Sequence, residues 1–141
     1  MKAHDAIIPT RFMSSMSFLV STIMVFSTSA ENVVASLPKT YAEASFNANE
    51  TSLYFALAVT IICIGINLFG FMAGFSMFLH GPNVLVVISH TVGTLYACVF
   101  IIEAWHYLTF WYISVFCAIP VALLEVVIIL GTFCLGGLNR V

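Results

Sequence analysis

The chain has very little charge for its length. Among its 141 residues there are four Lys or Arg and six Asp or Glu, a charged fraction of 7%, whereas hydrophobic residues account for 62%. A soluble fold with this composition could not cover its surface with polar groups. The net charge of −2 arises from these few groups, and no basic run offers a contact surface for nucleic acid. The composition therefore excludes a soluble protein and a nucleic-acid-binding protein.

Cysteine motifs and long polar segments are also missing. The four cysteines lie far apart within apolar stretches, and none belongs to a CxxC or Cys/His spacing: Cys63, Cys98, Cys117 and Cys134. We therefore expect no disulfide framework, no zinc site and no cofactor. The polar segments are too short to form a soluble catalytic or scaffold domain, so we expect the helices themselves to carry the function.

Long apolar runs are what the sequence has in abundance. Four of them fill most of the chain, at residues 11–29, 53–79, 84–104 and 111–135. A helix rises about 1.5 Å per residue, so about 20 apolar residues cross a hydrocarbon layer of about 30 Å. The sequence therefore predicts an all-α integral membrane protein, in which residues 1–141 form a single domain, a four-transmembrane-helix bundle.

The first run is the most polar of the four. Ser17 and Ser21 lie four residues apart in it and form a small-residue face that would let a neighbouring helix approach closely. An alternative is that the small residues 27–30 form a cleavage site. The first thirty residues would then be a removable signal peptide, and three spans would remain.

The segment 31–52 is the only substantial loop, and positive charges indicate which side of the membrane it occupies. In a four-span protein Lys2, Arg11 and Arg140 fall on one side and Lys39 falls on the other. Because Lys and Arg are enriched on the cytoplasmic side, we expect cytoplasmic termini and an extracytoplasmic loop. Asn49 begins an Asn-Glu-Thr sequon in this loop, which makes it a candidate glycosylation site close to the second span.

Small residues recur at helical spacing in the other spans. They are Gly70 and Gly74 in the second span, Ser89, Gly93 and Ala97 in the third, and Ala118 and Ala122 in the fourth. Such stripes let helices pack closely, so we expect contacts within the bundle, with self-association through the two glycines of the second span as the alternative. Pro120 removes a helical hydrogen bond and is expected to bend the fourth span.

Three polar side chains lie deep within the apolar runs. Asn67, His90 and Glu125 fall at a similar depth when the spans alternate in direction. A carboxyl group near the middle of a span costs about 2.5–3.5 kcal/mol on insertion scales, so Glu125 should face protein. We interpret the three as a buried polar network that holds the bundle together. The alternative is a proton or ion pathway that uses Glu125 and His90.

Aromatic residues crowd the connection between the third and fourth spans. Their amphipathic rings are typical of the headgroup level of a membrane: Trp105, Tyr107, Trp111 and Tyr112. Glu103 and His106 have the i, i+3 spacing of a di-iron ligand pair, but a di-iron bundle needs two such pairs and the chain has one. We therefore predict no metal site there.

The order of residues also resembles a known family. The matching pieces are Ile8-Pro9-Thr10-Arg11-Phe12, Leu37-Pro38, Gly70-Phe71 with Gly74 and Ser76-Met77-Phe78, His90, Glu103-Ala104-Trp105, and Trp111-Tyr112-Ile113 with Val115-Phe116-Cys117, Pro120 and Glu125. Together they resemble the transmembrane protein 107 family over nearly the whole chain. The chain departs from that family at Asn67, where an acidic residue is expected, and in its C-terminal tail, which lacks a lysine run.

The resemblance implies a non-enzymatic membrane component of the ciliary transition zone. It would help to assemble the Meckel syndrome protein module and its diffusion barrier, and so support cilium biogenesis and protein localisation to the cilium. The expected partners are membrane lipid, tectonic-like and meckelin-like membrane proteins, and B9-domain proteins. The alternatives are a small proton-linked transporter or channel subunit that uses Glu125 and His90, and a haem or quinone anchor.

Overall fold

The chain folds into helices of membrane-spanning length. The computed structural model describes residues 3–76 and 79–138, with side chains described for 6–76 and 79–134. The elements in chain order are α1 (Ala3–Ser27), α2 (Ser29–Ala35), α3 (Glu43–Met72), α4 (His80–Ile102), α5 (Leu108–Ile113), the π-helical turn η1 (Ser114–Ala118) and α6 (Ile119–Leu138). Within these described residues, four segments are long and apolar enough to cross a membrane: Ala6–Ser27, Glu43–Met72, His80–Ile102 and Leu108–Cys134. The prediction of an all-α, four-span membrane protein is confirmed.

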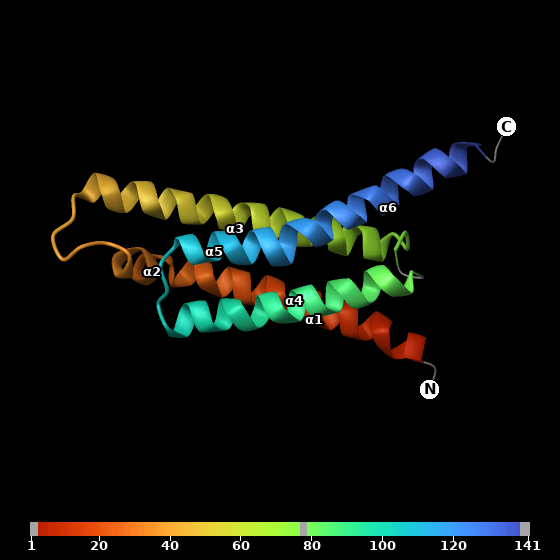
Figure 1. Cartoon of the computed structure of the whole chain (residues 1–141), viewed down its shortest axis with the longest axis horizontal. Coiled ribbons are helices and arrows are strands. Elements are labelled where there is room, and N and C mark those ends of the chain that lie inside the picture. The colour runs from red at the N-terminus through yellow and green to blue at the C-terminus, as the bar shows by residue number, and fades with distance from the viewer. Residues whose placement is uncertain (1–2, 77–78, 139–141) are drawn as a thin grey trace.

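The spans alternate in direction, so the two ends of the bundle differ. Figure 1 shows that α1 begins and α6 ends at the same end, which we call the termini end. The opposite end, which we call the loop end, carries α2, the connection from α2 to α3 and the turn between α4 and α5. An even number of spans produces this arrangement.

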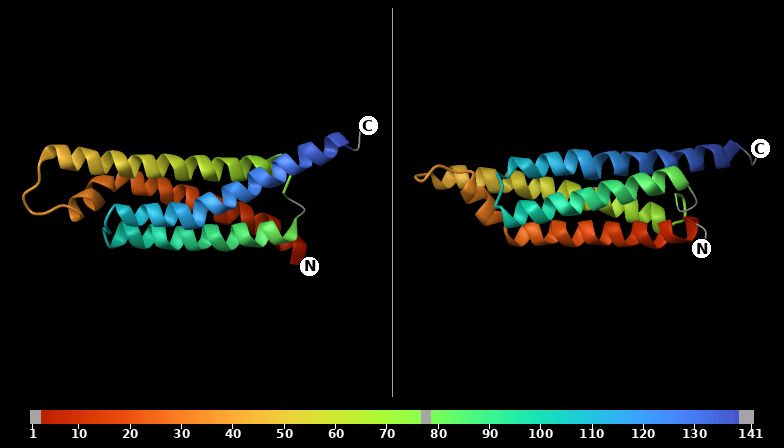
Figure 2. Two further views of the ribbon diagram at one scale, coloured as in Figure 1. Left: turned by 45° about the horizontal axis from the view of Figure 1, so that its top comes forward. Right: turned by 60° about the horizontal axis from the view of Figure 1, so that its bottom comes forward.

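Two parallel helix pairs build the bundle. α1 packs along α4, and α3 packs against α6 (Figure 1); the turned views of Figure 2 show the same spans running side by side along the bundle. On the first pair, Ser15 contacts His90. Where α3 meets η1, the turn that leads into α6, the Thr60 hydroxyl donates a hydrogen bond of 2.9 Å to the Ser114 hydroxyl. Polar side chains therefore help to set the register of both pairs.

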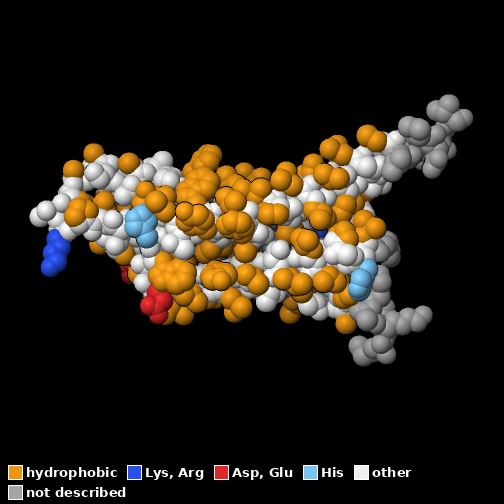
Figure 3. All heavy atoms as spheres, in the orientation of Figure 1, with side chains coloured by type: hydrophobic (Ala, Val, Ile, Leu, Met, Phe, Trp, Pro, Cys, Tyr) orange, Lys and Arg blue, Asp and Glu red, His pale blue; other side chains and the backbone are white. Residues whose placement is uncertain are grey.

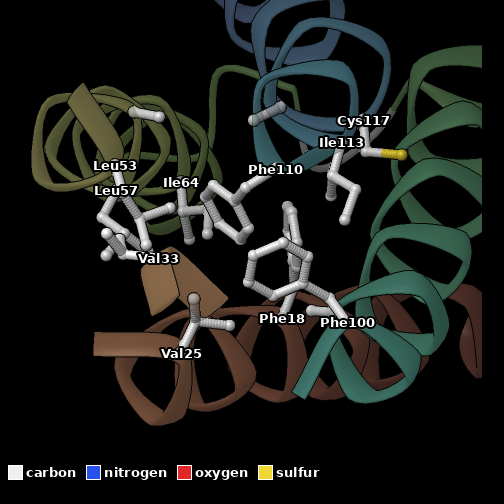
Figure 4. Packing of buried hydrophobic residues seen from close by; sticks show 13 residues of the cluster. Phe18, Val25, Val33, Leu53, Leu57, Ile64, Phe100, Phe110, Ile113 and Cys117 are labelled. Atoms are coloured by element: carbon white, nitrogen blue, oxygen red, sulfur yellow. The ribbon is translucent and has the colours of Figure 1, made fainter. Parts of the chain in front are cut away.

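An aromatic core fills the loop half of the bundle. Figure 4 shows Phe18 of α1, Phe100 of α4 and Phe110 of α5 pointing toward one another, and all three are fully buried. The rings of Phe100 and Phe110 meet edge to face with centroids 5.5 Å apart, a favourable aromatic geometry. Gly93 makes this packing possible, because a Cβ atom there would lie 2.9 Å from the Phe18 ring and 3.0 Å from Cys117 Cβ.

The second span differs in its limits from the expected 53–79. α3 begins at Glu43, ten residues earlier, where Glu and Ala favour helix and Glu43 complements the positive end of the helix dipole. It ends at Met72 with Gly74 in the left-handed region at φ 81°. The N–H of Gly74 bonds to the carbonyl of Phe71 and that of Phe75 to the carbonyl of Gly70, which completes a Schellman motif. Gly74 therefore ends the helix and does not extend a packing stripe.

The third span ends in the same way but without glycine. Ala104 follows α4 with φ 46°, and the N–H of Trp105 bonds to the carbonyl of Phe100 at 3.3 Å. Of the aromatic residues expected at the headgroup level, Trp105 and Tyr107 lie at this turn, and Trp111 and Tyr112 lie in the second half of α5. Trp111 donates from Nε1 to the Ser52 hydroxyl at 3.3 Å, and its ring centroid lies 6.0 Å from that of Phe55.

The fourth span changes its helical pitch just before proline. The turn η1 ends at Ala118, and the N–H of Ile119 bonds to the carbonyl of Ser114 five residues back. Pro120 has no N–H for the next hydrogen bond, which gives a physical reason for the widened turn at this place. Beyond it, α6 diverges from α4 toward the termini end (Figure 1).

The outer surface is apolar over the length of the spans. Figure 3 shows hydrophobic side chains covering most of the visible face of the bundle. Large exposed hydrophobic residues occur on every span, for example Met24, Phe69, Leu95 and Val127. In water this surface would be unstable, whereas in a bilayer it faces hydrocarbon.

Candidate functional site

A buried arginine lies in the termini half of the bundle. Arg11 stands in the third turn of α1, with a side chain only 1% exposed. The sequence suggested an arginine at the entrance of the first span, but α1 already begins at Ala3 and carries Arg11 into the protein interior. A cation there needs a counter-charge and hydrogen-bond acceptors.

The guanidinium group of Arg11 has both a counter-charge and hydrogen-bond acceptors. Arg11 Nη2 donates to Glu125 Oε2 at 2.9 Å, and the Glu125 side chain is fully buried. Arg11 Nη1 donates to the Ser76 hydroxyl at 2.8 Å and to Asn83 Oδ1. The guanidinium carbon also lies 5.1 Å from the centre of the Phe71 ring, within cation–π range. α1, the α3–α4 connection, α4 and α6 are joined in this way at one point.

The carboxylate of Glu125 is held equally closely. The Ser76 hydroxyl donates to Glu125 Oε1 at 2.5 Å, so each carboxylate oxygen has a partner. Gly70 of α3 faces this carboxylate, since a Cβ atom at Gly70 would lie 2.1 Å from Glu125 Oε1. Glycine at this position therefore creates the space that the buried carboxylate occupies. We call Arg11, Gly70, Ser76, Asn83 and Glu125 the ion-pair cluster.

A second polar contact, between α1 and α4, lies one helical turn deeper in the bundle. Ser15 Oγ and His90 Nδ1 are 2.9 Å apart and both side chains are buried. The Phe18 ring packs against the imidazole with centroids 5.4 Å apart. Arg11, Ser15 and Phe18 follow each other at helical spacing on the buried face of α1. Ser15 and Phe18 of this face both contact His90 of α4.

The predicted polar network is therefore divided among different partners. Glu125 bonds to Arg11 and Ser76, and His90 contacts Ser15. Asn67 is fully buried, yet within residues 6–76 and 79–134 neither of its amide atoms has a hydrogen-bond partner. The structure thus buries all three predicted residues without a direct hydrogen bond among them, and it adds Arg11 and Ser15 as their partners on α1.

The small residues at helical spacing have mixed positions. Gly70, Gly93, Ala97, Ala118 and Ala122 are buried at helix contacts, as is Ser21 on α1. Ser17 is exposed, so the close-packing face of α1 does not run through Ser17 and Ser21 as expected. Ser89 is half-buried, and a Cβ atom at Gly74 would meet nothing within 4 Å. The helix phase places the α1 contact face along Arg11, Ser15 and Phe18.

The candidate metal ligands and the candidate glycosylation site lie toward the loop end of the bundle. His106 Nδ1 accepts a hydrogen bond of 3.2 Å from the Leu108 N–H, and both His106 and Glu103 are exposed. Among the described residues no group of three His, Cys, Asp or Glu is placed to hold a metal ion.

Asn49 lies inside α3, where the Thr51 hydroxyl of the sequon bonds to the Asn47 carbonyl at 2.7 Å. The sequon is thus part of a regular helix.

The charge bias that predicted the orientation depends on residues with different surroundings. Arg11 is enclosed in the ion-pair cluster and does not face the membrane surface. Lys2 and Arg140 lie outside the described residues. The expected cytoplasmic position of the termini stays a prediction.

Sequence reasoning missed Arg11 as a site residue, although a signal for it existed. Glu125 lies in the middle of an apolar run and needs a cationic partner. Among the Lys and Arg residues, Arg11 is the one next to an apolar run that contains serines, and Ser15 follows it one helical turn later. Hydropathy placed Arg11 at a membrane boundary, because apolar windows do not show where a helix begins. Matching the buried carboxylate to each cation would have found the pair.

The fold and the ion-pair cluster define a class of protein. Four spans, short connections and an enclosed arginine–glutamate pair are features of a small multi-pass membrane protein held together by internal polar contacts.

The chain is similar to known proteins along most of its length. The family model of transmembrane protein 107, described as a transmembrane protein, matches residues 7–129. Transmembrane protein 107 of Xenopus laevis is 32% identical over 133 residues, which cover 94% of this chain and 95% of that protein. The one of Homo sapiens is 31% identical over 129 residues, 92% of each chain. No solved structure matches. The chain belongs to the transmembrane protein 107 family.

Proposed function

We propose that this chain is a non-enzymatic membrane component of the ciliary transition zone. It would help to assemble the Meckel syndrome protein module and its diffusion barrier, and through them control cilium formation and the composition of the ciliary membrane. Membership of the transmembrane protein 107 family supports this proposal, and the family's name does not refer to any catalytic activity.

The observation that carries the proposal is the contrast between the interior and the outer surface. The deep charged groups are used in contacts among the chain's own helices, as in the ion pair of Arg11 with Glu125. The outer faces of the spans offer large apolar side chains, such as Phe69 and Val127. Such a bundle is suited to packing against lipid and against the spans of other membrane proteins, and its short connections leave assembly as its means of action.

The partners we propose are tectonic-like and meckelin-like membrane proteins, which would pack against the spans, and B9-domain proteins. Both termini would face the cytoplasm and the loop 36–42 would face outward. The transport alternative gains no support from the geometry, because Glu125 is enclosed by Arg11 and Ser76 while His90 contacts Ser15.

The test is super-resolution imaging of the chain tagged at its own locus in ciliated cells, beside markers of the basal body and the axoneme. We expect a ring at the ciliary base, and we expect loss of the protein to change ciliary membrane composition. An even distribution over the endoplasmic reticulum or plasma membrane, with normal cilia after loss, would refute the proposal.

A further inference from the structure

A lipid-facing cavity lies between α4 and the segment formed by α5 and η1. Its volume is about 340 Å³, within the range of small-molecule sites, and its lining is almost entirely apolar. The main walls are Val92 and Tyr96 on one side and Tyr112 and Phe116 on the other, and all four are exposed on the outer face of the bundle. The cavity is therefore open to the bilayer and separate from the ion-pair cluster.

The cavity has the depth of one membrane leaflet. Its loop end is lined by Trp105, in the turn between α4 and α5 where interfacial aromatic rings gather, and by Thr109 in the first turn of α5. Val92 lies ten residues before the end of α4 at Ile102. At about 1.5 Å per residue these ten residues extend about 15 Å, which is half of a hydrocarbon core of about 30 Å. A ligand in the cavity would have its polar head at the loop end and its body within one leaflet.

The polar groups in the cavity suit a small neutral head. Thr109, Tyr96 and Tyr112 each have a hydroxyl and Trp105 has an indole N–H, so the walls contain donors and acceptors for a single hydroxyl group. The lining includes no Lys or Arg, and the charged residue nearest in sequence is Glu103, an exposed carboxylate two positions before Trp105. A phosphate head would find no cation in the lining.

The shape of the walls favours a rigid body over a flexible chain. Flat aromatic rings line the cavity from both helices, and η1 contributes Phe116 and Cys117. A π-helical turn is an unusual local structure that occurs often at functional sites, and here it borders the cavity. We propose that this cavity binds a sterol-class lipid, with one hydroxyl near Thr109 and Trp105 and a rigid ring system between α4 and η1.

The test uses the full-length protein in lipid nanodiscs with a photoreactive, clickable cholesterol analogue. Mass spectrometry of the irradiated protein should find the label concentrated within residues 92–117. Excess unlabelled cholesterol should compete with it, and excess phosphatidylcholine should not. Label distributed over the exposed faces of α1, α3 and α6, or equal competition by phosphatidylcholine, would overturn the proposal.

A variant with a filled cavity gives an independent readout. Val92→Trp places a large ring in the cavity and should lower labelling roughly tenfold. Leu95→Trp is the matched control, because Leu95 is exposed on the same helix but does not line the cavity, and it should leave labelling unchanged. Equal labelling of two folded variants would contradict the site. If Val92→Trp does not fold, the position of the label on the unchanged chain decides.

Discussion

Arg11 and Glu125 are 114 residues apart in the chain, and their side chains meet at 2.9 Å in the interior of the bundle. Since one lies on α1 and the other on α6, the pair joins the first and last spans. Neither charge is stable in this environment without the other, because a buried ion loses its hydration. Each charge is therefore tolerated in the interior only when the other is present.

Replacing one partner of the ion pair should lower the free energy of unfolding strongly, whereas replacing both partners should lower it little. Glu125→Gln leaves a buried arginine without a counter-charge and should lower the free energy of unfolding by about 3 kcal/mol. The double variant Arg11→Met with Glu125→Leu should recover most of that loss, because apolar side chains of similar volume can replace a buried pair. Equilibrium unfolding in mixed detergent micelles measures all the variants. Additive losses in the double variant would contradict the coupling.

Gly70 should not tolerate even one methyl group. Gly70→Ala puts a Cβ atom 2.1 Å from Glu125 Oε1, so the carboxylate must move and its bonds to Arg11 and Ser76 must lengthen. We expect a loss of about 2 kcal/mol in unfolding free energy, typical of overpacking. Gly65→Ala on the same helix is the control, since nothing lies within 4 Å of its Cβ position. Equal effects of the two changes would contradict the close approach.

Asn67 should be replaceable by an apolar residue with a gain in stability. Its amide is fully buried with neither polar atom bonded within the described part of the chain. Asn67→Leu, which has a similar shape, should raise the unfolding free energy by about 1 kcal/mol by removing an unsatisfied polar group. The same unfolding assay applies, with Ser15→Ala as a comparison that should destabilise. A loss of stability in Asn67→Leu would show that the amide does take part in a polar network.

Gly74 after α3 and Ala104 after α4 both adopt left-handed backbone conformations, so exchanging glycine and alanine at the two positions should change protein stability in opposite directions. Ala104 adopts φ 46°, which is unfavourable for a residue with a Cβ atom, so Ala104→Gly should stabilise the protein by about 0.5–1 kcal/mol. Gly74→Ala should destabilise it by about 1 kcal/mol, although no atom lies within 4 Å of the added Cβ. Thermal unfolding of both variants in one detergent checks the signs. Changes of the same sign would refute the conformational explanation.

The sequence predicted the number of spans because hydropathy depends only on the solvent that each segment faces. The third span, expected at 84–104, is found at His80–Ile102, and the fourth, expected at 111–135, is found at Leu108–Cys134. The helix limits were less predictable. Residues 43–52 are mostly polar and lie in α3 nevertheless, because a helix can extend beyond the hydrocarbon into water.

The contacts between spans could not be derived from a single sequence in the same way. The burial of Glu125 and His90 followed from their polarity, but their partners on α1 depend on which spans pack together and in what register. The exposure of Ser17 shows the same limit, because two serines four residues apart do not fix the phase of the helix against its neighbour. Parallel packing of α1 on α4 brings Arg11 to Asn83 and Ser15 to His90, whereas the contact with Glu125 also depends on where α6 lies.

The central claim is that the buried ion pair serves the architecture of an assembly protein and moves no proton. The most direct test is to express the double variant Arg11→Met with Glu125→Leu in ciliated cells that lack the endogenous protein. We predict that it forms a ring at the ciliary base and restores cilium formation to the level of the unchanged chain. A double variant that folds and reaches the ciliary base but restores nothing would contradict the claim and assign the charged pair a direct function.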